Sequence, residues 1–411
     1  MAKATQNIVG IDIGSSKVGV LIGAPDGAGG LEVVGMGSAP NRGTRRGNIV
    51  NMEATVEALK QATDEAEVMA GVEVSRAYVG MAGVDIKSVN SRGMVSVSRK
   101  DREITAADIK RVLEAAQSAA LPSDREILHA IPQEFIVDDQ GGISEPLNML
   151  GSRLEVNVHL VTGHVTRGKT LLTCVNRAGI EVIEMVFEPL ATADAVLTPD
   201  EKELGTLLID IGSGTCGYGL FAEGEVQHSG VIPVGASHFT NDLAQVLKTP
   251  FAEAERLKVR NGCCLGSLVD DDEGIRVPSV GGGGERVIPR QHLCEILQAR
   301  AEELLGLIQR DLERVGRDGQ IRGGIVLTGG GAALVGLTEL AGLTFDTPVR
   351  GGLPRDIGGL IEVLNQPTWS TAAGLLLYGQ AAEQADRRSQ RSAFSMRSMV
   401  GRFRGVFADL L

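Results

Sequence analysis

The segment Ile11–Ser15, with the sequence IDIGS, recurs as Ile209–Ser213 in the second half of the chain. Each copy follows an apolar run and precedes a second run of strand-forming residues. Each therefore predicts a strand, a tight glycine turn and another strand. Because the whole context is repeated, and not only five letters, we interpret the pattern as an internal duplication. It predicts two related α/β lobes with a cleft between them, where ligand sites commonly form.

The composition limits the classes of function. A chain of 411 residues is expected to form more than one domain. Hydrophobic residues make up 43% and charged residues 22%, as in globular proteins with sizeable cores. The net charge of −12 disfavours a general nucleic-acid-binding protein. Five cysteines without C-x-x-C spacing predict neither a disulfide framework nor a zinc site. We expect no signal peptide and no spanning helix, which needs ~20 apolar residues.

Three glycine-rich stretches could hold phosphates: Asp12–Lys17, Asp210–Thr215 and Thr328–Gly331. Backbone N–H groups in tight glycine turns point at bound anions. Asp12 and Asp210 end their strands, and two carboxylates facing one triphosphate suit Mg²⁺, which keeps most of its waters. The candidate ligand residues are Gly14, Ser15, Ser16, Lys17, Gly212, Ser213, Gly214, Thr215, Gly329, Gly330 and Gly331, with Asp12 and Asp210 as water-mediated metal residues.

The glycine motifs resemble the phosphate and adenosine motifs of the actin/Hsp70/sugar-kinase superfamily. More narrowly, the chain is similar to the FtsA family of bacterial cell-division proteins. The similarity lies in IVGIDIGSSKV, HAIPQEFIVD, VHLVTG, LLIDIGSGT, AEAERLKVRNG, VPSVGG, GIVLTGGGAAL and STAAGLLLYG. It implies an α/β, actin-like (ribonuclease H-like) fold, ATP and Mg²⁺ in the cleft, and self-assembly into filaments. It also implies that the tubulin-like protein FtsZ is tethered, by its C-terminal tail, to the cytoplasmic face of the inner membrane at the septum, with other division proteins as further partners.

The resemblance implies a division of the chain. Lobe IA is expected at residues 1–83, 164–195 and 361–378, with an inserted 1C subdomain at 84–163. Lobe IIA is expected at 196–235 and 306–360, with lobe IIB at 236–305. Residues 379–395 are polar and predict a flexible linker, followed by an amphipathic helix at 396–411.

One departure from the family pattern concerns hydrolysis. The family usually has an acidic residue seven positions after Asp210, and this chain has Gly217. Asp210 is then the main residue left to hold the attacking water, as a weak catalytic candidate. Since positioning and base catalysis are each worth orders of magnitude in rate, we expect ATP binding with slow or absent hydrolysis.

The sequence also matches two other phosphate-binding motifs, of which the first is kept as an alternative and the second is dismissed. Gly163–Thr170 matches the G-x-x-x-x-G-K-[ST] loop of P-loop NTPases, with Lys169 on the phosphates. It leaves the repeated hairpins unexplained, and the family reading makes Lys169 an exposed helix residue. Gly212–Gly217 matches G-x-G-x-x-G, but a strand and not a helix is expected next. A small-molecule kinase of the same superfamily is a further alternative, separable by a screen of phosphoryl acceptors.

Five charged residues each have two possible roles, one in binding and one as part of a solvated surface. Glu255 and Lys258 lie on a predicted helix near the superfamily's ribose contact, or on a solvated helix face. Arg286, Arg290 and Arg300 lie where the family's second lobe meets the acidic, apolar tail of FtsZ, or on a charged surface helix. Arginine suits such a tail because its planar fork donates two bonds to one carboxylate.

The C-terminal end predicts an amphipathic helix that binds anionic lipid. Six arginines and two aspartates lie between residues 386 and 411, and a basic helix with one apolar face is typical of interfacial binding. The alternative is a terminal helix docked on its own domain. The apolar stripe consists of Met396, Met399, Val400, Phe403, Val406, Phe407 and Leu410.

Overall fold

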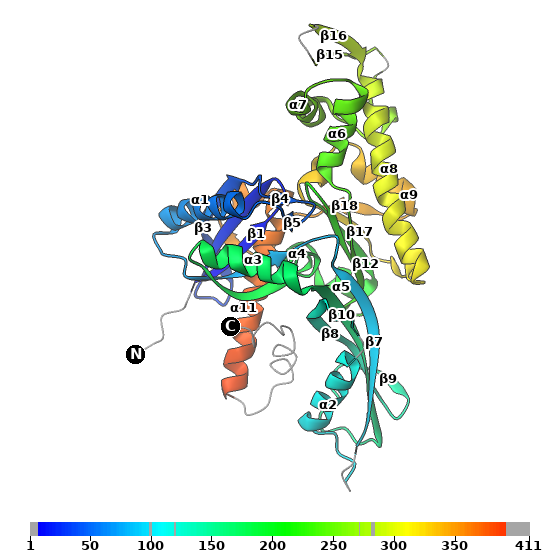
Figure 1. Ribbon diagram of the computed structural model, residues 1–411. Coiled ribbons are helices and arrows are strands. Elements are labelled where there is room, and N and C mark those ends of the chain that lie inside the picture. Colours follow the sequence, from blue (N-terminus) through cyan, green and yellow to red (C-terminus); the bar gives the residue numbers. More distant parts are fainter. Residues whose placement is uncertain (1–6, 98–100, 119–120, 271, 281–283, 392–411) are drawn as a thin grey trace.

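The computed structural model describes residues 7–97, 101–118, 121–270, 272–280 and 284–391. Two mixed sheets form the centre of an elongated molecule (Figure 1). A separate four-stranded sheet extends at one end, and a two-stranded ribbon beside a long helix extends at the other. None of the helices in these ranges is long and apolar enough to cross a membrane.

The first lobe is built on a six-stranded sheet with the order β11-β6-β1-β2-β3-β19. Strands β1, β2 and β3 are antiparallel, and β6 and β11 run parallel to β1. The strands are β1 (Ile8–Ile13), β2 (Lys17–Pro25), β3 (Leu31–Pro40), β6 (Arg76–Met81), β11 (Glu181–Phe187) and β19 (Gly358–Gly359).

The second lobe repeats this arrangement in a five-stranded sheet, β14-β13-β12-β17-β18. The antiparallel hairpin β12–β13 corresponds to β1–β2, and the parallel strands β17 and β18 correspond to β6 and β11. The predicted duplication is therefore confirmed. The strands are β12 (Thr206–Ile211), β13 (Cys216–Ala222), β14 (Glu225–Ile232), β17 (Gly324–Thr328) and β18 (Val349–Gly351).

Helices cover the first sheet and join the two lobes. Helix α1 (Met52–Ala70) packs on β2 and β3, begins at the Asn51 cap and ends at Gly71, whose φ of 67° suits a C-terminal glycine. Helix α3 (Val165–Arg177) packs beside α1. Helices α4 (Glu188–Val196) and α11 (Ser370–Arg391) pack on each other, and their buried residues form one core with residues from both sheets.

The inserted subdomain is a four-stranded antiparallel sheet, β7-β10-β8-β9, backed by α2 (Ala106–Gln117). Its strands are β7 (Lys87–Ser96), β8 (Arg125–Val137), β9 (Gln140–Ile143) and β10 (Arg153–His164). The subdomain contacts strand β14 of the second lobe, where the buried His159 Nε2 lies 2.8 Å from Ser229 Oγ.

The second lobe carries its own insertion, which forms the opposite end of the molecule (Figure 1). It consists of α6 (Ala236–Val246), α7 (Phe251–Asn261), β15 (Gly274–Pro278), β16 (Glu285–Pro289) and α8 (Arg290–Arg314). The remaining elements are β4 (Thr44–Arg45), β5 (Asn48–Ile49), α5 (Pro199–Leu204), α9 (Leu337–Phe345), α10 (Ile361–Leu364) and four short 3₁₀ turns: η1 (Gly266–Leu268), η2 (Asp318–Gln320), η3 (Gly330–Ala333) and η4 (Pro367–Trp369).

The prediction of a flexible linker from residue 379 is wrong as far as Arg391, because α11 continues to that residue. Residues 379–391 are polar, but most of them are good helix formers such as Ala, Gln, Glu and Arg. The preceding turns are fixed by packing on α4 and β1, so the helix extends from an established nucleus. The predicted amphipathic helix at 396–411, with all seven stripe residues, lies outside the described residues.

Candidate functional site

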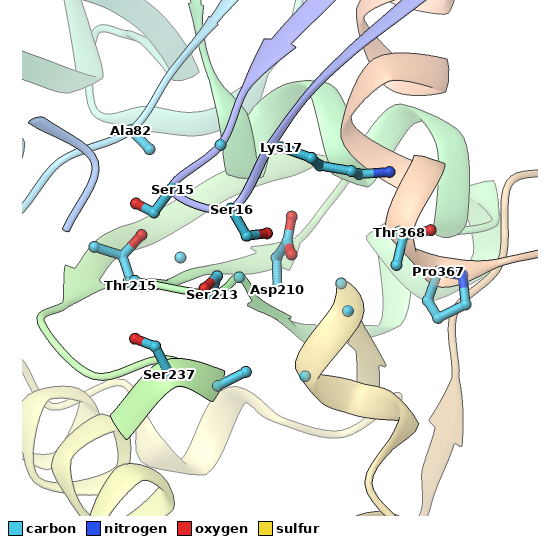
Figure 2. Close-up of a pocket in the computed structure, with 18 of the residues that line it drawn as sticks. Ser15, Ser16, Lys17, Ala82, Asp210, Ser213, Thr215, Ser237, Pro367 and Thr368 are labelled. Carbon is cyan, nitrogen blue, oxygen red and sulfur yellow. The ribbon is translucent and has the colours of Figure 1, made fainter. Parts of the chain in front are cut away.

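A cavity of about 580 Å³ lies in the cleft between the lobes. Both predicted hairpins line it, and Figure 2 shows Ser15 and Ser16 of the first hairpin above Ser213 and Thr215 of the second. All the predicted phosphate-binding residues belong to its lining: Gly14, Ser15, Ser16, Lys17, Gly212, Ser213, Gly214, Thr215, Gly329, Gly330 and Gly331. Segments far apart in the sequence therefore meet at one place of a size typical for small-molecule sites.

The two hairpins have the same local geometry. A Cβ atom built on Gly14 would lie 3.0 Å from the carbonyl oxygen of Lys17, and one on Gly212 would lie 3.1 Å from that of Thr215. In each case the turn leaves no easy room for a side chain. The absence of side chains at these two positions keeps the backbone accessible from the cavity, as phosphate turns require.

Three carboxylates gather at the base of the cavity: Asp12, Asp210 and Glu188. Burial raises the pKa of Asp12 to about 6, with Lys17 opposing the shift and Asp210 adding to it. Burial, then the charges of Asp12 and Asp210, raise the pKa of Glu188 well above its usual range. Three carboxyl groups share one low-dielectric space, so their ionised forms repel one another. A bound cation would relieve this repulsion.

Asp210 is held by helices of the first lobe. Its Oδ2 accepts hydrogen bonds from the hydroxyls of Thr192 on α4 and Thr371 on α11, each at 3.0 Å. These bonds oppose the rise in the Asp210 pKa that burial causes. On its other side, a Cβ atom at Gly329 would lie 2.3 Å from Oδ1, and φ at Gly329 is +81°. The third glycine motif thus packs directly against the Asp210 carboxylate.

Lys17 lies in the same hairpin as Asp12, and its positive charge acts on the Asp12 carboxylate. Its Nζ lies 3.9 Å from the centroid of the Trp369 ring, and Figure 2 shows the side chain directed toward Thr368. Burial lowers the Lys17 pKa, and the charge of Asp12 opposes that shift. A cation over an indole ring is stabilised without being neutralised, so Lys17 keeps a charge available for a phosphate.

The donor set fits Mg²⁺ held through water. Among the described residues, no three His, Cys, Asp or Glu side chains could hold a metal ion by themselves. Mg²⁺ does not need such a cage, since it usually keeps several waters and takes one or two carboxylates together with substrate phosphates. The repelling carboxylates Asp12 and Asp210 supply that charge, and bound phosphates would complete the shell.

The far wall of the cavity comes from α6 and α7. Glu255 and Lys258 both line it. Their ion pair measures 2.8 Å, and Lys258 Nζ also donates to the Ala236 carbonyl at 3.1 Å. The Thr240 hydroxyl donates to Glu255. These bonds fix two polar side chains opposite the Gly329–Gly331 turn.

Glu188 was not anticipated from the sequence. It is the first residue of α4, directly after β11, and is followed by Pro189. An acidic residue at the end of a strand that runs parallel to β1 was the available signal, because such ends meet at one edge of the sheet. A Cβ atom at Gly217 would lie 2.9 Å from Pro189 Cγ. The site therefore has no room for a side chain at position 217, and its extra carboxylate comes from Glu188.

The P-loop reading is wrong. Gly163 lies within β10 and Gly168 within α3, and the strand passes into the helix at His164 and Val165 without a loop. Lys169 is exposed and does not line the cleft cavity. The G-x-G-x-x-G match also lacks its helix, because Gly217 belongs to strand β13.

The three arginines proposed for partner binding lie on β16 and α8, away from the cavity. Arg290 pairs with Glu273 at 2.6 Å, and Arg300 Nη2 donates to Asp242 Oδ1 at 2.9 Å. Arg286 donates to the Leu247 carbonyl. Two of the three are thus engaged in ion pairs within the chain.

Comparison with known proteins agrees with this architecture. The family described as "Cell division protein FtsA" matches residues 207–374, and "SHS2 domain inserted in FTSA" matches residues 83–162. A cell division protein FtsA from Pseudomonas aeruginosa is 47% identical over 372 residues, covering 90% of this chain and 89% of that protein. The FtsA of Escherichia coli K12 is 40% identical over 391 residues, covering 92% of each.

Solved structures share the fold at low sequence identity. A chain of the PilM–PilN type IV pilus biogenesis complex has a TM-score of 0.67 at 16% identity, covering 92% of this chain and 99% of that one. MreB5 of Spiroplasma citri bound to ADP has a TM-score of 0.56 at 16% identity, covering 95% of this chain and 100% of that one. These likenesses establish the actin-like fold.

Proposed function

The chain belongs to the FtsA family of cell-division proteins, and on that premise we propose that it binds ATP with Mg²⁺ in the cleft, forms filaments and tethers FtsZ filaments to the cytoplasmic membrane at the division septum. The observation that carries the nucleotide part is the meeting of two equivalent glycine hairpins around one cavity. Their carboxylates, Asp12 and Asp210, lie on opposite lobes. A nucleotide between them would hold the lobes together.

The residues of the cleft have separable roles in this proposal. The hairpin backbones cradle the phosphates, Lys17 neutralises part of their charge, and Glu255 with Lys258 contacts the sugar end. Mg²⁺ would neutralise part of the phosphate charge. Asp12 and Asp210 would hold it through water. Gly329, Gly330 and Gly331 let the flat adenine approach the main chain.

Hydrolysis is proposed to be slow, below the order of 1 s⁻¹ typical of dedicated enzymes. Glu188 is the candidate general base, because it is the third carboxylate of the cavity. Burial, and then the charges of Asp12 and Asp210, raise the pKa of Glu188, and a cation bound nearby would lower it. Asp210 is poorly suited to that role, since its Oδ2 is occupied by two threonine hydroxyls.

The membrane and partner functions rest on other parts of the chain. The apolar stripe from Met396 to Leu410, with its basic flanks, supports peripheral attachment to anionic lipid. The surface around Arg286, Arg290 and Arg300 remains the proposed site for the FtsZ tail. An incoming tail carboxylate would compete with Glu273 and Asp242 for these guanidinium groups. The inserted subdomain is the proposed contact for other division proteins.

Equilibrium binding of ATP to the full chain tests the cleft. Gly212→Val should weaken binding by about tenfold or more, since its Cβ already lies 3.1 Å from the Thr215 carbonyl oxygen and tenfold is only ~1.4 kcal/mol. Lys169→Ala, on the exposed face of α3, should leave binding unchanged. Loss of binding in Lys169→Ala with retention in Gly212→Val would contradict the proposed site.

Co-sedimentation tests the tether. The full chain, with ATP and vesicles containing anionic lipid, should carry FtsZ into the pellet. A chain ending at residue 395 should bind ATP normally but leave FtsZ in the supernatant. Equal sedimentation of FtsZ by both chains would contradict the role of the C-terminal stripe.

A further inference from the structure

A second cavity, of about 300 Å³, adjoins the first at the tips of the hairpins. It shares five lining residues with the cleft cavity: Ser15, Ser213, Gly214, Ser237 and Phe251. In Figure 2 Ser15, Ser213 and Ser237 lie on the side of the site away from Pro367 and Thr368. The second cavity therefore opens from the phosphate end of the proposed nucleotide site.

The wall of this cavity includes the tight turn between β4 and β5. Its two central residues, Arg46 and Gly47, have φ angles of 52° and 73°. A two-residue hairpin with both angles positive favours Asn or Gly at its first position. Arginine in that conformation is strained, and such strain persists where a side chain has a use.

The turn is attached to both phosphate hairpins. The backbone N–H of Gly47 donates to Ser15 Oγ at 3.1 Å in the first hairpin. A Cβ atom at Gly214 in the second hairpin would lie 3.0 Å from the backbone N and Cα of Arg46. Asn41 Nδ2 also donates to the Gly14 carbonyl at 2.9 Å. The arginines are thus held at a fixed place where the two lobes meet.

The lining of the second cavity is rich in cations and donors. It contains Arg45, Arg46, His238, Asn241 and four hydroxyl residues, and no Asp or Glu is among its described lining residues. This is unusual in a chain with 52 acidic and 40 basic residues. Within the described part of the chain, neither Arg45 nor Arg46 forms an ion pair, whereas Arg290 and Arg300 do.

His238 adds an imidazole ring to the lining. Burial lowers its pKa, so the ring is uncharged near neutral pH. Its Nδ1 lies 3.1 Å from the backbone N and 3.3 Å from the carbonyl oxygen of Gly235. Guanidinium, amide and hydroxyl donors together suit a small oxyanion.

We propose that this second cavity, the arginine cavity, binds inorganic phosphate and is the first resting place of the phosphate released from ATP. The inference rests on the proposed nucleotide function for its biological meaning. The cleft cavity holds the carboxylates Asp12, Asp210 and Glu188, which repel a free phosphate dianion once its bond to the nucleotide is broken. The arginine cavity, at the tips of the same hairpins, is lined instead by the positively charged Arg45 and Arg46.

Equilibrium dialysis with labelled inorganic phosphate tests the inference on the full chain, with and without saturating ADP and Mg²⁺. The double variant Arg45→Gln with Arg46→Asn removes both charges, and Asn tolerates the left-handed conformation at position 46. We expect about a tenfold loss of phosphate affinity, equivalent to ~1.4 kcal/mol. Arg45→Gln alone, outside the strained position, should lose part of it. Arg42→Gln is the control, since Arg42 is exposed on the same loop and lines neither cavity.

Each outcome decides the question. Phosphate affinity within twofold of the parent in the double variant, an equal loss in Arg42→Gln, or no phosphate binding by the parent at millimolar concentration would each overturn the arginine cavity. Parallel titrations with ATP and ADP keep the two proposals apart. A parent chain that binds ATP but not phosphate defeats only this inference. Arginine-dependent phosphate binding without nucleotide binding defeats only the proposed nucleotide function.

Discussion

We expect the hydroxyl of Thr371 to contribute to the binding of Mg²⁺-ATP. It donates a hydrogen bond to the Asp210 carboxylate and so joins that carboxylate to α11. Thr371→Val keeps the shape of the side chain and removes one hydrogen bond of 3.0 Å to a carboxylate that is 9% exposed. A hydrogen bond to a charged group contributes about 1.5–3 kcal/mol. If the bond positions Asp210 for Mg²⁺, its loss corresponds to a decrease of roughly 10- to 150-fold in Mg²⁺-ATP affinity.

The assay is a titration of ATP at saturating Mg²⁺, accompanied by the thermal unfolding midpoint without nucleotide. Thr192→Val should behave similarly, and the double variant should fall short of the sum of the two losses. Both hydroxyls bond the same oxygen and lie 3.0 Å from each other, and such pairs are not additive. Thr173→Val is the matched control, since its hydroxyl donates to the Lys169 carbonyl on an exposed face. Parent-like affinity and midpoint in Thr371→Val would refute the reasoning.

Three further results are expected. Glu188→Gln should retain the affinity for ATP within about threefold. The rate of ATP hydrolysis should fall by a factor on the order of 10² or more, because a general base is lost. An unchanged hydrolysis rate would exclude that role. Without nucleotide, the thermal unfolding midpoint should rise as the pH falls from 7 toward 5. The pKa of Asp12 is about 6 in the folded chain and 3.8 as the ordinary value, so protonation in this range favours the folded state. Mg²⁺-ATP should reduce this pH dependence. Gly329→Ala should abolish ATP binding, since its Cβ would lie 2.3 Å from Asp210 Oδ1, whereas Gly351→Ala, with no atom within 4 Å of its Cβ, should not.

The repeated hairpins made the duplicated fold predictable from the sequence. Each copy has an apolar, strand-forming run on both sides of a glycine turn, and that local pattern is present in the structure as β1–β2 and β12–β13. The parallel neighbours were also visible as short apolar runs, such as Gly324–Thr328. Strand β8 of the inserted subdomain is harder to predict, because it runs from Arg125 to Val137 through Pro132, and proline disfavours a strand interior.

The part of the site that was missed depends on contacts between distant segments. Thr192 and Thr371 are ordinary helix residues in the sequence, and they matter only because α4 and α11 pack together beside Asp210. Glu188 carries a local signal, a carboxylate after a strand, but its pKa is raised by its burial between the packed elements and then by the charges of Asp12 and Asp210 on other strands. Spacing along the chain does not encode such distances.

The position of α11 has a mechanical consequence for any coupling between nucleotide and membrane. Trp369, immediately before this helix, lies against Lys17, and Thr371 in its first turn bonds Asp210. The helix then runs for 22 residues to Arg391, a length of about 33 Å at 1.5 Å per residue. It ends directly before the C-terminal segment that carries the apolar stripe. A rotation of the second lobe must either break the Asp210–Thr371 bond or displace the start of α11. Because a helix moves as a rigid body over this length, displacing the start of α11 would also shift its end at Arg391, directly before the residues that we propose bind lipid.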